Sequence, residues 1–369
     1  MIAIVSCSHY PDDERIYHKE IKTLAEKKYN INYFTLSDSE QDLSDNYINH
    51  INYSSVKHSI KEYANLVELE IRKTSVKVIH IHEPELFSLA VNIKKLTGAK
   101  IIYDVHEDYI SMMYTFSKWN KYVKYLKSKY WLFKEEFFLK HVDEVIIASS
   151  TIVNSDFKMQ GFAPVLLENF PLSTFVKNID ISHKIKNSLI YHGNMGPERG
   201  ITELIEAMIH VVKKIPDAKL SLIGGFRTNE YKYEVYRKID KLGIRDHINL
   251  KNHILHQDIW QYLAKHSVGI IPFNENLLTR TNTPTKLFEF MASGCQLVVP
   301  SLKPITKYDF KASKFFKSGD ILELSDMIIK SLENIDHSGI EYNFNKIRSD
   351  YNWEKNSYKL IELYDRVLK

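Results

Sequence analysis

The chain has 369 residues, which exceeds one usual hydrophobic core and predicts two domains. Its 44% hydrophobic and 26% charged residues are ordinary for a globular protein, so membrane-spanning and disordered classes are not favoured. The 50 basic and 46 acidic residues leave a net charge of only +4, which does not argue for a nucleic-acid partner, and two cysteines exclude a disulfide framework.

The amino-terminal residues form a short apolar segment without a basic leader, so we expect no secretory signal. No apolar run approaches the roughly 20 residues of a membrane span. We therefore expect a cytoplasmic protein that meets a membrane only from its surface, at the inner face of the plasma membrane.

The first elements alternate between strand and helix. Ile2–Cys7 is predicted as a buried strand, Arg15–Lys28 as a helix and Ile31–Leu36 as a second strand. This order predicts the start of a doubly wound parallel sheet. Residues 37–58 are polar and weakly patterned, and a helix follows them to about Arg72.

The next predicted strand, Val76–His82, carries two histidines on one face. His80 and His82, with Glu83 beside them, have the residue types of a metal site. Parallel strands are buried on both faces, however, and spacing places no third ligand, so we expect hydrogen-bonded histidines and no metal.

An apolar strand that begins at Lys100 ends in a polar cluster containing Asp104, His106 and Glu107. The carboxyl ends of parallel strands form one edge of the sheet, where open α/β sheets bind ligands. The loop after the first strand reaches the same edge and carries His9 and Arg15. These two residues are candidates for a ligand-binding site, with a solvated polar loop as the alternative.

Residues 112–140 alternate aromatic side chains with seven lysines in an amphipathic helical pattern. Two interpretations stay open. The segment lies on an anionic membrane surface, or its aromatic side chains pack on the sheet while its lysines stay solvated.

A polar connection near Pro171–Lys186 is the predicted hinge, so the expected domains are 1–175 and 186–349. The second domain begins with a strand from Ser188 that enters a glycine-containing loop with Gly193 and Arg199. Backbone N–H groups of such a loop and an arginine suit a diphosphate.

The rest of the second domain alternates again and closes with two predicted helices. The predicted strands are Lys219–Gly224, Ile248–Leu250 and Val268–Phe273, and the predicted helices are Glu230–Leu242, Asp320–Asn334 and Ser349–Leu368.

Between the last strand and the closing helices lies the most informative segment, Pro284–Pro300. Thr283 is predicted to cap its helix, and Gly294 to end it before a buried strand. Lys286 and Glu289 are three residues apart and face the same sheet edge. The lysine suits a phosphate, and the glutamate can accept hydrogen bonds from a ribose diol; a solvated ion pair is the alternative.

The run from Lys286 to Val299 resembles the donor-binding signature of retaining, nucleotide-sugar-dependent glycosyltransferases with the GT-B fold (family 4). The resemblance implies an α/β protein of two Rossmann-like domains that face a central cleft. It also implies that Glu289 binds the donor ribose. Thr281 stands where this family often carries a further glutamate.

Other segments carry the same resemblance. Residues 100–109 are similar to a family motif whose histidine, here His106, lies against the donor sugar, which implies a catalytic role. The loop at 193–200 is similar to the family's phosphate loop, with Arg199 as its second basic residue and Asn194 in place of the first. In this fold the last helix, about 350–369, packs back on the first domain.

The resemblance implies transfer of a hexosyl group from a nucleoside-diphosphate sugar to a glycan or lipid-linked glycan hydroxyl, with retention, in bacterial surface polysaccharide synthesis. We expect no cofactor and no metal. Two alternatives stay open: a sugar-nucleotide-modifying enzyme of epimerase type, and a non-catalytic nucleotide- or glycan-binding partner. The expected donor residues are Gly193, Arg199, Lys286, Glu289 and Thr281, and the acceptor-side candidates are His9, Arg15 and Glu107.

Overall fold

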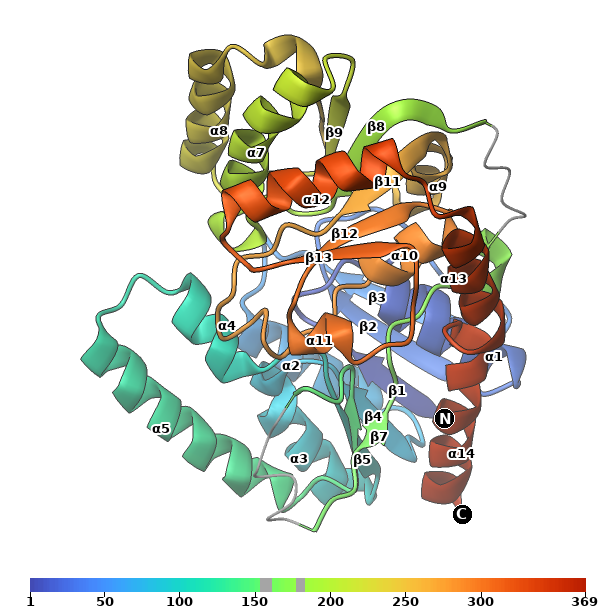
Figure 1. Ribbon diagram of the computed structural model, residues 1–369. Helices are drawn as coiled ribbons and strands as arrows, with labels where there is room; N and C mark the ends of the chain where they lie inside the picture. Colours follow the sequence, from blue (N-terminus) through green and yellow to red (C-terminus); the bar gives the residue numbers. More distant parts are fainter. Residues whose placement is uncertain (153–160, 177–182) are drawn as a thin grey trace. The chain divides into compact units, whose positions relative to one another are not determined.

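The computed structural model describes residues 1–152, 161–176 and 183–369, which form two compact units (Figure 1). Unit 1 comprises Met1–Asn169 with Trp353–Lys369, and unit 2 comprises Phe170–Asn352. The carboxyl-terminal helix thus belongs with unit 1. Residues 177–182 of the expected hinge lie outside the described residues.

The described part of unit 1 is built on a seven-stranded parallel sheet in the order β3-β2-β1-β4-β5-β6-β7. The sheet order reverses at β1, so the edge between β1 and β4 is the topological switch point, where open α/β sheets bind ligands. The strands are β1 (Ile2–Val5), β2 (Ile31–Leu36), β3 (Ile48–Tyr53), β4 (Val78–Ile81), β5 (Lys100–Val105), β6 (Glu144–Ile147) and β7 (Val165–Leu166).

Helices accompany this sheet, and two of them, Ile60–Ile71 and Phe87–Thr97, bury their apolar faces against it in a core of the unit's own. They are the π-helix η1 (Glu14–Ile21), α1 (Lys22–Glu26), α2 (Ile60–Ile71), the 3-10 turn η2 (Pro84–Leu86), α3 (Phe87–Thr97), α4 (Tyr109–Phe116), α5 (Lys121–Leu139) and α14 (Trp353–Leu368). Helix α14 is fixed to unit 1 by the indole N–H of Trp353, which donates to the Thr23 hydroxyl at 2.8 Å.

Unit 2 repeats the arrangement with a six-stranded parallel sheet in the order β10-β9-β8-β11-β12-β13 among its described residues. Counted from its own first strand, this is the order 3-2-1-4-5-6 of dinucleotide-binding folds, with the switch point between β8 and β11. The strands are β8 (Ile185–His192), β9 (Lys219–Ile223), β10 (Ile248–Lys251), β11 (His266–Ile270), β12 (Gln296–Pro300) and β13 (Ser313–Phe316).

Unit 2 has its own hydrophobic core, formed between this sheet and its helices. The helices are η3 (Ser173–Phe175), η5 (Pro197–Arg199), α7 (Ile201–Lys214), α8 (Asn229–Leu242), η6 (Arg245–His247), α9 (His256–Lys265), α10 (Lys286–Ala292), α11 (Lys303–Thr306), α12 (Ile321–Glu333) and α13 (His337–Ser349). No helix in the described ranges of either unit combines the length and the apolarity that a membrane span requires.

Strand β3 and helix α13 are among the elements that were not predicted from the sequence. Strand β3 lies in the stretch 37–58 that is polar and weakly patterned, and among its six residues only Ile48 is buried. It forms because the backbone of β2 offers a free edge from Ile31 to Leu36. Helix α13 carries glycine, serine and asparagine, which weaken helix propensity, but buries Ile340, Phe344 and Ile347 along one face.

Two local predictions were wrong. Helix α10 begins at Lys286 after a turn, and Thr283 does not cap it; the residue at the cap is Thr285, which makes no side-chain capping bond. The segment 112–140 contains two helices, because Asn120 caps the start of α5: its side-chain Oδ1 accepts hydrogen bonds from the backbone amides of Tyr122 and Val123.

Candidate functional site

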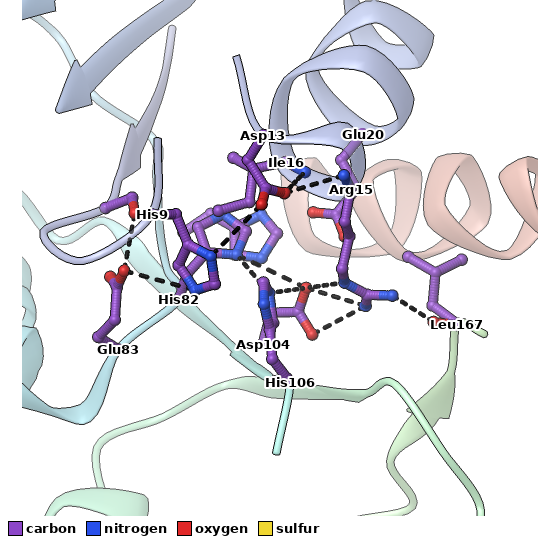
Figure 2. Close-up of polar contacts among 12 residues, drawn as sticks. His9, Asp13, Arg15, Ile16, Glu20, His82, Glu83, Asp104, His106 and Leu167 are labelled. Atoms are coloured by element: carbon purple, nitrogen blue, oxygen red, sulfur yellow. Dashed lines mark hydrogen bonds and ion pairs between the residues drawn. The ribbon is translucent and has the colours of Figure 1, made fainter. Parts of the chain in front are cut away.

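Three neighbouring strands of unit 1 end beside one another and bring histidines and carboxylates together (Figure 2). His82 directly follows β4, Asp104 lies near the end of β5, and His106 follows β5. His9 comes from the loop after β1. These residues therefore gather at the switch point of the sheet. With Arg15 and Glu20 of η1 they form what we call the His106 cluster.

Arg15 is the cation of this cluster. The guanidinium donates to both carboxylate oxygens of Asp104 at 3.0–3.1 Å and to the carbonyl oxygen of Leu167 at 2.6 Å. Asp13 caps the start of η1 by accepting from the amides of Arg15 and Ile16, each at 2.9 Å. Arg15 is only 4% exposed, so it positions Asp104 and does not fit the acceptor contact predicted for it.

Two buried carboxyl groups share the charge of Arg15 unequally. Burial raises the pKa of Asp104, but the positive charge of Arg15 outweighs this effect and holds the pKa well below its usual range. Burial and the neighbouring Asp104 raise the pKa of Glu20 well above its usual range. Asp104 is therefore the ionised member, and Glu20 is the protonated one.

Asp104 sets the tautomer of His106. The Nε2 atom of His106 lies 3.2 Å from a carboxylate oxygen of Asp104 and 3.1 Å from Nδ1 of His82. An ionised carboxylate only accepts hydrogen bonds, so Nε2 carries the proton, and Nδ1 of His106 is left as an acceptor. Burial lowers the pKa of His106 to about 4, against the opposing effect of Asp104, so the ring is neutral at pH 7.

His9, an acceptor-side candidate, lies against the His106 ring with 4.8 Å between ring centroids. Burial lowers the pKa of His9, but the Asp13 carboxylate at 3.5 Å outweighs it, so the net shift is upward. Glu83 fixes this loop because its carboxylate accepts from the amides of Cys7 and Ser8 at 3.1 and 3.0 Å. Glu83 is thus a positioning residue that the sequence did not reveal.

Four buried residues of this region have ligand atoms within 4.8 Å of one another. The set, Glu20, His80, His82 and Asp104, replaces the trio of His80, His82 and Glu83 considered from the sequence. Arg15 already supplies positive charge between the two carboxyl groups, at 3.0 Å from each. These residues therefore form a network around an arginine, and we assign no metal to it.

Glu107, the third acceptor-side candidate, points to a neighbouring part of unit 1. It lines a pocket together with Tyr109, Trp131 and Glu135. The rings of Tyr109 and Trp131 stack there with 4.1 Å between centroids. Aromatic faces beside carboxylates suit a sugar, because its C–H groups stack on rings while its hydroxyls donate to the acids.

Unit 2 gathers its own set at the switch point between β8 and β11, which we call the Glu289 cluster: His192, His256, Lys286 and Glu289. Strand β8 ends at His192, whose carbonyl oxygen accepts from Nζ of Lys286 at 2.5 Å. Gly193 follows with φ of +102°, and a Cβ atom there would lie 3.1 Å from this Nζ. The predicted donor residues Gly193 and Lys286 are therefore brought together.

Arg199 of η5 is part of the same neighbourhood. Its guanidinium stands 4.6 Å from the centre of the Phe273 ring, and Nζ of Lys286 lies 5.2 Å from the same ring. Burial first, and the charge of Arg199 second, lower the pKa of Lys286 well below its usual range. An anion bound here would attract both cations and so offset the repulsion that lowers the pKa of Lys286.

Glu289 is held between two histidines. One carboxylate oxygen lies 2.9 Å from Nε2 of His256, and the other lies 2.9 Å from Nε2 of His192. Burial raises the pKa of Glu289, but the two imidazoles outweigh it and hold the pKa well below its usual range. The ionised carboxylate has about four lone-pair positions, so it can also accept from a diol.

The two histidines were missed as site residues from the sequence. The available signal was position alone: His192 ends a strand just before Gly193, and His256 starts helix α9. Thr281, by contrast, was expected at the donor site. Its hydroxyl donates to the carbonyl oxygen of Leu278 at 3.0 Å within its own loop, so its donor role stays a prediction.

Comparison with known proteins identifies a family that unit 2 resembles. Residues 176–342 match the family described as "Glycosyl transferases group 1". No curated protein matches the sequence.

Solved structures resemble the whole chain at low identity. Sucrose-phosphate synthase from Thermosynechococcus elongatus has a TM-score of 0.80 at 14% identity over 99% of this chain and 98% of that one. Anabaena HepE in complex with UDP-glucose has a TM-score of 0.78 at 12% identity over 99% of both chains. WaaG, a glycosyltransferase involved in lipopolysaccharide biosynthesis, has a TM-score of 0.70 at 14% identity over 97% and 98%.

The matched region contains η5, α10 and every residue of the Glu289 cluster. The strand orders of the two parallel sheets account for the likeness to these enzymes along the whole length. Residues 176–342 therefore resemble the glycosyl transferases group 1 family, and the chain has the GT-B fold.

Proposed function

We propose that the protein transfers a hexosyl group from a nucleoside-diphosphate sugar to a glycan or lipid-linked glycan hydroxyl, with retention at the anomeric carbon. The observation that carries the proposal is that the two cations Lys286 and Arg199 lie by the same ring, that of Phe273, in unit 2. The charge of the ionised Glu289 also acts on Lys286. Two cations suit a diphosphate, and a carboxylate suits a ribose diol.

The cations also serve the chemical step. Negative charge grows on the diphosphate as its bond to the anomeric carbon breaks, and fixed positive groups stabilise such charge strongly in a water-poor site. Lys286 and Arg199 supply this role from the protein's own side chains. We therefore propose turnover without a metal ion or another cofactor.

His106 is the proposed catalytic residue of unit 1. Its neutral ring and its acceptor Nδ1 suit a sugar hydroxyl, because they add no positive charge near an anomeric carbon that becomes electron-poor. The acceptor oxygen forms its bond on the face from which the diphosphate leaves. The proton of the acceptor hydroxyl passes to the departing phosphate oxygen, so atoms and charge balance.

The place of this reaction in bacterial surface polysaccharide synthesis belongs to the same proposal. WaaG acts in lipopolysaccharide biosynthesis and has the same fold as this chain, which supports the choice. HepE binds UDP-glucose, so we take UDP-glucose as the first donor to test.

The test measures release of nucleoside diphosphate from a panel of nucleotide sugars, with and without glycan acceptors, for the wild type and His106→Ala. We expect acceptor-dependent release and, for the variant, a kcat that falls far more than the donor Kd rises. Nuclear magnetic resonance of the product should show the anomeric configuration of the donor.

Three results would contradict the proposal. Turnover of the nucleotide sugar without any acceptor indicates an epimerase-type enzyme. Binding without turnover across the panel indicates a non-catalytic partner. A folded His106→Ala protein with nearly native kcat removes His106 from the chemical step.

A further inference from the structure

Helix α5 has two apolar faces, and only one of them is packed in unit 1. Buried Trp131 stacks on Tyr109, and Phe138 stacks on Phe87 of α3 with 5.1 Å between ring centroids. Leu139 is fully buried on the same side. In Figure 1 the helix lies along the border of unit 1, in teal.

The second apolar face is turned to solvent. We call it the exposed stripe, and its members are Tyr122, Leu126, Tyr130, Phe133 and Phe137, each 52–70% exposed. They follow one another at intervals of four, four, three and four residues, so on a helix with about 100° per residue they form one ridge. The ridge is about 22 Å long at about 1.5 Å per residue.

The exposed stripe stands opposite the packed side. At about 100° per residue, the stripe and the buried positions Trp131 and Glu135 are centred about 180° apart around the helix axis. A helix on a globular protein normally turns polar residues to water on that side. Contiguous exposed apolar surface of this kind marks an interaction site.

The charges beside the stripe are almost all positive. Between residues 117 and 141 there are seven lysines and two glutamates, and one of the two, Glu135, is buried. Helical spacing places Lys127 and Lys134 on one flank of the stripe and Lys129 and Lys140 on the other. Trp119, 45% exposed, adds an aromatic ring at the amino end, with Nζ of Lys127 at 4.1 Å from the ring centre.

We propose that the exposed stripe of α5 docks on an anionic phospholipid surface, with the helix lying flat in the headgroup region. Aromatic and leucine side chains enter the acyl boundary, tyrosine and tryptophan rings keep their polar ends in the interface, and lysine stems extend to lipid phosphates. Each lysine near an anionic leaflet contributes about 1 kcal/mol, so the charges and the apolar ridge act together.

Charge complementarity decides between this occupant and a second copy of the chain. Two stripes packed face to face would bring two rows of lysines of the same sign together. An anionic bilayer neutralises the same rows. The inference stands apart from the donor chemistry, because it needs neither Lys286 nor His106.

The first experiment floats the full-length protein with vesicles of phosphatidylcholine alone and of phosphatidylcholine with phosphatidylglycerol, at low and high salt. We expect co-flotation with the anionic vesicles at low salt, weaker co-flotation at high salt and none with the neutral vesicles. Absence of flotation with anionic vesicles at low salt overturns the proposal.

Two variants test the face itself. The stripe variant is Leu126→Ser with Phe133→Ser and Phe137→Ser, and the charge variant is Lys127→Glu with Lys129→Glu and Lys140→Glu. Each should lower the vesicle partition coefficient by about tenfold or more. The charge variant keeps the test decisive if the stripe variant folds poorly by circular dichroism.

Control variants carry changes of the same kind at exposed helix positions elsewhere: two exposed aromatic residues in Tyr233→Ser with Tyr358→Ser, and three lysines in Lys61→Glu with Lys95→Glu and Lys241→Glu. The controls should float like the wild type. Equal flotation of the α5 variants and the controls contradicts the assignment to α5. A dimer in light scattering that the stripe variant abolishes, together with undiminished flotation of that variant, assigns the stripe to a second copy instead.

Discussion

At the scale of single residues, the His106 cluster distributes charge so that a histidine stays neutral beside an ionised carboxylate. Arg15 neutralises Asp104, and Glu20 keeps its proton. His106 then needs no charge of its own to bind Asp104. The outcome is one defined tautomer, with Nε2 donating and Nδ1 accepting.

The tautomer predicts the effect of Asp104→Asn. Arg15 needs an acceptor, so the amide oxygen turns to the guanidinium and the amide N–H₂ turns to His106, which moves the ring proton to Nδ1. Loss of a charge-assisted hydrogen bond costs roughly 1.5–3 kcal/mol, so kcat should fall about ten- to a hundredfold.

The readout is the nitrogen chemical shifts of His106 in a labelled protein, recorded beside kcat and KM. Asp143→Asn is the control, because Asp143 pairs with Lys94 at 2.6 Å outside the cluster. An unchanged tautomer in a folded Asp104→Asn protein would refute the positioning role of Asp104.

Lys286 makes a second prediction, which concerns pH. Burial and Arg199 depress its pKa in the free protein, and a bound diphosphate raises that pKa again. A diphosphate is already ionised above its last pKa of about 6, so at a pH between the free and the bound pKa of Lys286 binding should take up a proton at this residue. Affinity should therefore weaken as pH rises between the free and the bound pKa.

Calorimetry at a series of pH values above 7, in two buffers of different ionisation enthalpy, measures this uptake. Lys286→Arg keeps its charge at every accessible pH, so uptake should disappear in that variant. Equal heats in both buffers for the wild type would show that Lys286 does not titrate on binding.

At the scale of elements, the strongly periodic segments were predictable, and the segments defined by distant partners were not. Strand β3 depends on the free edge of β2, and α13 on contacts made by three apolar side chains. The same reason explains the site. Lys286 and Glu289 share one helix and were found together, whereas His192 and His256 reach Glu289 from elements 97 and 33 residues away and were missed.

The turn after β8 should not tolerate the substitution Gly193→Ala. Gly193 has φ of +102°, and an added Cβ would stand 3.1 Å from Nζ of Lys286. The change should strain the backbone by about 1–3 kcal/mol and displace the lysine, which weakens nucleotide binding as well.

Gly98→Ala is the matched control, because Gly98 also has positive φ, of +74°, but nothing lies within 4 Å of its Cβ position. It should lower the melting temperature without weakening nucleotide binding. Equal nucleotide affinity in the two variants would argue against a role for the turn in placing Lys286.

At the scale of the whole molecule, both units use one strand order and each gathers polar residues at its own switch point. The sequence predicted domains of this α/β type at 1–175 and 186–349, and the compact units of the structure are Met1–Asn169 with Trp353–Lys369 and Phe170–Asn352. The burial of Arg15 beside Asp104 could not be predicted from its place in the first loop, because it depends on the packing of η1.

Because protein cations are proposed to stabilise the leaving diphosphate, we expect turnover in excess EDTA. Lys286 and Arg199 stabilise the leaving diphosphate, so chelation should leave the rate of nucleoside diphosphate release within about twofold of the untreated enzyme. Loss of activity that manganese or magnesium restores would contradict this part of the account.

The central claim is that Arg199, Lys286 and Glu289 form one nucleotide site, and calorimetry tests it most directly. UDP, GDP and ADP are titrated into the wild type, each alanine variant and the control Arg245→Ala, whose guanidinium likewise lies over a ring, that of Tyr236, at 5.1 Å. The account predicts roughly ten- to a hundredfold weaker binding of the preferred nucleotide in all three site variants and native affinity in the control. Native affinity in all three folded variants would contradict it.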